Sequence, residues 1–206
     1  NISYTFTRPR YSINNHASYS RTDNFSSNNS FLRSGGLSAN FNINDRLSAS
    51  ASGSVNFTKN NQTTKYTTAR LSDSRSQQAS LGTNYILPNN DLLGGSLSYN
   101  YKKARGRHNG LIGRSFQVSY RHNLPFNQNI SLNFSRTANK YHATDALYLS
   151  TKVRKDFISS TSLSLGGPIG ESTWSYAINL NWSDAESNII NYTTSGQTMG
   201  LSLTKE

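Results

Sequence analysis

Residues 174–182 read W-S-Y-A-I-N-L-N-W, with a large apolar side chain at every second position. Serine, alanine and asparagine stand between them, and a tryptophan closes each end. A period of two is typical of a β-strand with one apolar and one polar face. We therefore expect this strand to have hydrocarbon on one side and a polar environment on the other.

The same alternation returns along the chain, whereas no segment shows a convincing period of 3.6 residues. The sequence therefore predicts an all-β fold. We count about eleven strands, near residues 2–12, 16–25, 36–43, 46–58, 75–87, 91–102, 113–123, 129–138, 147–167, 173–183 and 197–206.

The connections between these strands alternate in length. Short ones contain turn-forming residues, as in P-N-N-D at 88–91 and P-F-N-Q at 125–128. Longer polar loops are expected at 24–35, 59–75, 103–113, 138–147 and 184–196. Alternating short turns and long loops indicate an antiparallel transmembrane β-barrel of about 11–12 strands, or part of a larger one. A soluble β-sandwich and a β-solenoid are the alternatives, but no repeat of fixed length recurs.

Composition favours the membrane interpretation. The 206 residues are only 33% hydrophobic and 15% charged, yet 11% are aromatic. The usual hydrophobic share is about 45–50%, so a soluble fold would have little to bury. The chain begins with Asn1 and has no signal-peptide pattern, which indicates a mature form or an excerpt. We expect residues 1–206 to form one outer-membrane β-barrel domain, or a portion of one, in the bacterial outer membrane.

The net charge of +11 points to anionic partners such as lipopolysaccharide, an anionic polymer or, less readily, nucleic acid. Strand parity predicts that four basic residues face the lumen: Lys102, Arg121, Lys152 and Arg154. A second group, Lys103, Arg105, Arg107 and Arg114, surrounds a long loop and forms an outer-loop basic patch. Trp174 and Trp182 are expected at the two membrane interfaces, where an indole suits the headgroup boundary.

The sequence does not indicate a catalytic site or a metal site. Cysteine is absent, and the four histidines lack a second ligand at metal spacing. The few carboxylates fall mostly in expected turns and loops, so paired acid–base work is not expected. We expect no enzyme activity, no catalytic residues and no cofactor.

Residues 114–147, R-S-F-Q-V-S-Y-R-H-N-L-P-F-N-Q-N-I-S-L-N-F-S-R-T-A-N-K-Y-H-A-T-D-A-L, resemble the barrel of the fimbrial (chaperone-usher) ushers. The preceding residues 78–109 resemble usher sequence as well. In that family two strands of this type are joined by a short turn, although the strand tip here, Lys140-Tyr141-His142, lacks the family's glycine. The resemblance implies a wide outer-membrane barrel that secretes protein subunits.

Three functions from different classes follow. The leading interpretation is a protein-secretion pore of usher type, or part of one. The second is a porin or exporter for anionic solutes or polysaccharide, with the lumen cations as its filter. The third is a structural or adhesive outer-membrane barrel without transport.

Overall fold

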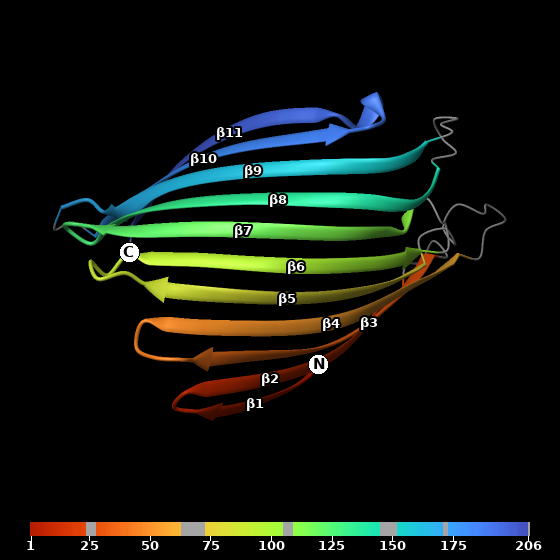
Figure 1. Cartoon of the computed structure of the whole chain (residues 1–206), viewed down its shortest axis with the longest axis horizontal. Coiled ribbons are helices and arrows are strands. Elements are labelled where there is room, and N and C mark those ends of the chain that lie inside the picture. Colours follow the sequence, from red (N-terminus) through yellow and green to blue (C-terminus); the bar gives the residue numbers. More distant parts are fainter. Residues whose placement is uncertain (24–27, 63–72, 105–108, 145–151, 171–172, 206) are drawn as a thin grey trace.

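The computed structural model describes residues 1–23, 28–62, 73–104, 109–144, 152–170 and 173–205. They form one antiparallel sheet in which each strand pairs with the next along the chain, from β1 at one edge to β11 at the other (Figure 1). The eleven strands are β1 Ile2–Arg8, β2 Tyr11–Asp23, β3 Asn28–Asn42, β4 Leu47–Gln62, β5 Ser74–Ile86, β6 Leu92–Ala104, β7 Leu111–Leu124, β8 Gln128–Thr144, β9 Val153–Pro168, β10 Trp174–Ser187 and β11 Thr194–Lys205. The all-β prediction is confirmed.

The strand ends that are joined by five residues or fewer between β1 and β2, β3 and β4, β5 and β6, β7 and β8, and β9 and β10 lie at one end of the sheet (Figure 1), whereas the connections at the other end are mostly longer. A 3₁₀ turn, η4 (Ile190–Tyr192), lies in the connection from β10 to β11. None of the described helical segments has the length and apolar character needed to cross a membrane. In bacterial outer-membrane barrels the short turns face the periplasm and the long loops the exterior. We therefore name the two ends of the sheet the turn end and the loop end.

The register sorts the side chains into two faces. Leu81 of β5 pairs with Leu97 of β6, and Leu97 pairs with Phe116 of β7. On the other face Ser80 pairs with Ser98, and Ser98 with Ser115. Apolar residues thus form continuous rows on one face, and small polar residues form rows on the opposite face. This is the division that the alternation in the sequence predicts.

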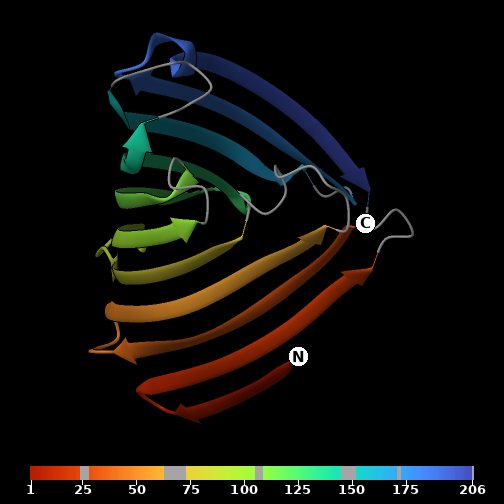
Figure 2. The same ribbon diagram turned by 90° about the vertical axis from the view of Figure 1, so that its right-hand side faces the viewer.

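The sheet is strongly curved (Figure 2), and the glycines of β3 to β7 identify the concave face. A Cβ added to Gly82 or Gly113, both on the polar face, would lie 2.8 Å from Ser50 Oγ or 2.7 Å from Asn139 Oδ1. On the apolar face, a Cβ on Gly53 or Gly95 would meet only backbone oxygens, at 3.8 and 4.0 Å. Side chains crowd where a sheet bends toward them, so the polar face is concave and the apolar face convex.

The convex face carries exposed hydrophobic side chains, whereas the sheet has almost no interior. Leu81 and Leu97 are each 64% exposed, and Ala104 is the one buried hydrophobic residue in the described part of the chain. A β-sandwich would bury such a face against a second sheet. Among the described residues no second protein layer covers the apolar rows, as expected for a surface that faces lipid.

The strand boundaries correct several predictions. The predicted strand at 2–12 ends at Arg8, and β2 begins at Tyr11. The loop expected at 24–35 was wrong from residue 28 onward, because β3 starts there, and the loop expected at 138–147 was wrong as far as Thr144. These stretches lack a regular alternation, as the adjacent Phe31 and Leu32 in β3 show, and this is why they resemble loops in the sequence. The predicted loops at 59–75 and 103–113 include residues 63–72 and 105–108, which lie outside the described residues.

Gly35 and Gly36 provide a test of the curvature, since they are adjacent but face opposite sides. A Cβ on Gly36 would lie 2.5 Å from His16 Cε1 and 3.0 Å from the Gly53 carbonyl oxygen, whereas on Gly35 it would meet only the His16 carbonyl at 3.7 Å. We expect Gly36→Ala to destabilise the barrel by about 1–3 kcal/mol, as overpacking does. Gly35→Ala should be neutral or stabilising by up to about 1 kcal/mol. Urea unfolding in lipid vesicles measures both; equal effects would contradict the assignment of the faces.

Candidate functional site: the concave face

The concave face is lined by serine pairs that bridge neighbouring strands. Ser52 and Ser80 have their Oγ atoms 2.7 Å apart, and the Oγ atoms of Ser98 and Ser115 are 2.5 Å apart. Ser131 and Ser164 form a similar pair at 2.5 Å, and Ser18 bonds Ser34 in the same way. Each hydroxyl offers one donor and two acceptor positions, so a paired serine can still bind water. This lining is suited to a wet passage.

Two of the basic residues predicted to face the lumen lie on this concave face. Lys102 of β6 is in register with Ser76, and Arg121 of β7 is in register with Ser131. Lys102 lies toward the loop end of its strand, whereas Arg121 lies toward the turn end. The two cations therefore stand at different depths of the same surface. Their role in a lumen stays a prediction.

Arg154, the third predicted lumen cation, lies on the same face but is held in a cluster. Its Nη2 atom lies 2.6 Å from Asp156 Oδ2, and its Nε atom donates to Asp156 Oδ1 at 2.9 Å. The guanidinium carbon lies 4.6 Å from the Tyr141 ring centroid and 3.4 Å from that of Tyr192. Asp156 is 4% exposed, so this bidentate pair is largely removed from water. Lys152, the fourth, directly precedes β9.

A neighbouring asparagine fixes the connection that contributes Tyr192. Asn188 Nδ2 donates to the Val153 carbonyl at 2.9 Å, and its Oδ1 accepts from the Lys155 amide at 2.7 Å. The Asn188 amide in turn donates to the Lys155 carbonyl at 3.1 Å. These bonds join the β10–β11 connection to the start of β9. The Arg154 cluster is therefore a structural element of the loop end.

The predicted outer-loop basic patch is divided by the structure. Lys103 lies in β6 and Arg114 in β7, and both are on the convex face: Lys103 is in register with Arg75, and Arg114 with Tyr99. Arg105 and Arg107 lie outside the described residues. Lys103 therefore faces away from Lys102, although the two are neighbours in sequence.

The two tryptophans predicted at the interfaces lie on the convex face of β10. Trp174 is at the turn end and 44% exposed, whereas Trp182, eight residues further on, is 39% exposed. Eight residues of strand span about 27 Å before any tilt is taken into account. Lys205 Nζ lies 6.0 Å from the Trp174 ring centroid. The interfacial role of both indoles stays a prediction.

The sequence reasoning missed a hydrogen-bonded carboxylate at the turn end. Asp91, only 1% exposed, accepts a hydrogen bond from Tyr120 Oη, and its Oδ1 lies 2.6 Å from His122 Nδ1. Asn89 Nδ2 donates to it at 2.7 Å. The Tyr120 hydrogen bond, helped by those of His122 and Asn89, lowers the pKa of Asp91 from its ordinary value despite its burial. The local sequence shows a turn but gives no sign of partners from β7.

These clusters of described residues do not form a metal site. Among residues 1–23, 28–62, 73–104, 109–144, 152–170 and 173–205, no three His, Asp or Glu side chains gather to hold a metal ion. The expectation of no enzyme activity and no cofactor stays a prediction.

An antiparallel meander with an apolar convex face and a hydroxyl-lined concave face defines the outer-membrane β-barrel class. Solved structures of this class match the chain: OmpT of Vibrio cholerae in a form lacking loop L8 (TM-score 0.63, 7% identity, 98% of this chain and 62% of that one), and OccAB3 of Acinetobacter baumannii (TM-score 0.56, 14% identity, 97% and 52%). The alcaligin outer-membrane receptor FauA of Bordetella pertussis matches too (TM-score 0.56, 12% identity, 99% and 37%).

Within that class the family is shown by sequence. Residues 17–204 match the family described as protein of unknown function DUF2860, and the chain belongs to this family. No curated protein matches the chain. The structural neighbours are outer-membrane proteins, in agreement with the predicted outer-membrane location. The chain spans about three fifths of the length of the OmpT structure and about half that of OccAB3.

The Arg154–Asp156 pair gives a prediction on stability. Asp156→Asn leaves the guanidinium without its counter-charge, and we expect a loss on the order of 2 kcal/mol, less than for a fully buried pair because Arg154 keeps some exposure. The double variant Arg154→Met with Asp156→Leu removes both charges and should lose less. Urea unfolding of the natural protein, Asp156→Asn and the double variant forms the comparison; a double variant at least as unstable as Asp156→Asn would contradict the prediction.

The Asp91 cluster gives a prediction on pH. A carboxylate whose pKa is lowered by folding stabilises the fold above its unfolded pKa, near 3.8, and this contribution is lost as the pH falls through the folded value. Asp91→Asn should therefore lower stability at pH 7, and its difference from the natural protein should shrink below about pH 4. Unfolding midpoints at pH 3 to 8 measure this. Asp45→Asn, at an exposed turn, is the matched control for losing one negative charge.

Proposed function

We propose that this chain forms part of the wall of a water-filled passage across the outer membrane, for small hydrophilic solutes with a preference for anions. The observation that carries the proposal is the concave face with its rows of small hydroxyl side chains, the opposite of the apolar convex face. A plugged or filled interior would favour larger side chains on this face. Serine pairs instead leave space and supply hydrogen-bonding groups along the inner surface.

The preference for anions rests on charge. Lys102 and Arg121 project from the concave face at two depths, and Arg154 is neutralised by Asp156. Cations in a narrow polar passage raise the local concentration of anions and repel cations. The filter that we propose therefore consists of Lys102 and Arg121, two of the four lumen residues predicted from sequence.

We propose a part of the wall because eleven strands are too few for a wide barrel. About eight strands enclose an interior filled by side chains, whereas 16–18 leave an aqueous channel. Eleven strands lie between these limits, and the sheet described here has β1 and β11 as its edges. Its match to 62% of OmpT and 52% of OccAB3 supports a sector of a wider wall.

A protein-secretion pore of usher type is the second candidate. Its support is the sequence likeness of residues 114–147, most of which form the β7–β8 hairpin. The structures named above are not described as ushers. A barrel that only adheres or supports the membrane would conduct no ions, so one measurement separates it from both pores.

Planar-bilayer recording of the full-length protein tests the proposal. We expect stable conductance steps with anion preference, and Lys102→Glu with Arg121→Glu should lower the anion-to-cation permeability ratio at least about twofold. Lys103→Glu, one residue away but on the convex face, is the matched control and should leave the ratio unchanged. A lack of steps would contradict a solute passage, and a ratio insensitive to the double variant would contradict the filter.

A further inference from the structure

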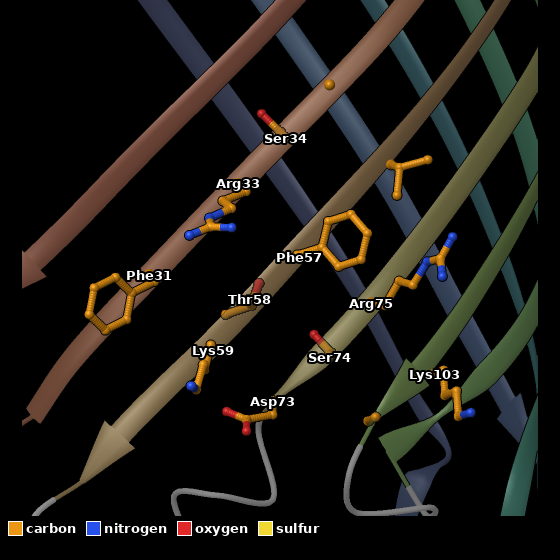
Figure 3. Close-up of a pocket in the computed structure, with 13 residues that line it drawn as sticks. Phe31, Arg33, Ser34, Phe57, Thr58, Lys59, Asp73, Ser74, Arg75 and Lys103 are labelled. Carbon is orange, nitrogen blue, oxygen red and sulfur yellow. The ribbon is translucent and has the colours of Figure 1, made fainter.

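The loop end of the convex face carries cations on four neighbouring strands, namely Arg33, Lys59, Arg75 and Lys103. Arg33 of β3, Phe57 of β4, Arg75 of β5 and Lys103 of β6 are successive cross-strand partners on this face. Figure 3 shows these side chains near one another, with Lys59 on the strand of Phe57. They line a groove of about 1090 Å³. The groove therefore combines four cationic groups with an aromatic floor.

This group of cations is electrostatically unfavourable without an anion. Arg75 and Lys103 stand directly opposite each other, and like charges in such a pair destabilise a sheet. Aromatic rings offset part of the cost: the Arg75 guanidinium lies 5.1 Å from the Phe57 ring centroid, and that of Arg33 lies 5.7 Å from Tyr19. Asp73 is the one carboxylate among the described residues that line the groove. Four cations against one carboxylate leave a net charge of +3 for an anionic group to neutralise.

A second groove adjoins the first one toward the middle of the membrane-facing surface. It has a volume of about 630 Å³, and small residues such as Ala51, Gly53 and Ala79 form its floor, with Leu37 and Leu81 beside them. The register connects the two grooves, because Gly53 follows Val55 and Phe57 along the same face of β4. The convex face thus passes from a cationic region into a mainly apolar groove, in which Arg114 is the one charged residue among the described lining residues.

We propose that these two grooves bind one phosphorylated, multiply acylated glycolipid of the outer leaflet. Its phosphate would lie among Arg33, Lys59, Arg75 and Lys103, and an acyl chain would follow the groove over Gly53 and Ala79. Arginine and lysine both bind phosphate through charge-assisted hydrogen bonds. A free aqueous anion would not occupy the apolar groove, whereas an acyl chain would. The position of both grooves on the lipid-facing side of the sheet also favours a membrane lipid. The inference concerns the convex face and stands apart from the proposed passage.

The test measures binding of the purified full-length protein to bis-phosphorylated hexa-acyl lipid A by native mass spectrometry. Arg75→Gln with Lys103→Gln should raise the Kd at least tenfold, and dephosphorylated lipid A should bind the natural protein at least tenfold more weakly. The matched control is Lys102→Gln with Arg121→Gln, which removes two cations from the concave face and should change the Kd less than twofold. Equal weakening by both double variants, or no preference for the phosphorylated lipid, would overturn the proposal.

A second variant keeps the test decisive if the first one folds poorly. Gly53→Phe fills the apolar groove and retains all four cations, and a Cβ at this position meets only the Gln78 carbonyl at 3.8 Å. We expect it to weaken lipid A binding at least fivefold. Inorganic phosphate is the competing probe: displacement of lipid A by equimolar phosphate would assign the site to a free anion and overturn the lipid. The anion selectivity of the proposed passage is tested with variants of Lys102 and Arg121. A negative result for lipid A binding therefore leaves the conductance test unaffected.

Discussion

Inside a bilayer no water is present to pair with backbone N–H and C=O groups, so these groups must bond to one another. The continuous antiparallel meander from β1 to β11 meets this requirement for every strand except at its two edges. Once the backbone is paired in this way, side chains alternate between two solvents. This explains how a chain that is only 33% hydrophobic can face lipid, since only every second residue needs to be apolar.

The curvature of the sheet connects the two faces. Bending toward the polar face crowds its side chains, which favours small residues such as serine and glycine in the middle of that face, whereas the outer face opens and accepts leucine, phenylalanine and tyrosine. Gly36 and Gly35 illustrate the difference between the faces at neighbouring positions, as do Gly82 and Gly95 at neighbouring rows. The small residues therefore do two things: they allow the sheet to curve, and they leave a polar surface inside it.

The sequence predicts the fold well within the apolar band. Alternation and turn residues such as Pro88 and Asn90, the latter with a φ of 66°, place most strands and turns correctly. It fails at the start of β3 and the end of β8, because the regular alternation of apolar and polar residues is lost there and the sequence resembles a loop. The charged clusters are harder still. Asp91 meets partners 29 and 31 residues away, and no local pattern records such contacts.

The net charge of the chain becomes informative only when the strand register assigns each charged residue to one face of the sheet. The composition gives +11 for the whole chain and suggests a single class of anionic partner. Lys102 and Lys103 show why that inference is too coarse: the first shares its face with serines, and the second shares its face with Arg75. A shift of register by one residue would exchange them. Adjacent lysines can therefore face two different environments, an aqueous passage and a lipid headgroup layer. The strand pairing determines that Lys102 faces the first and Lys103 the second.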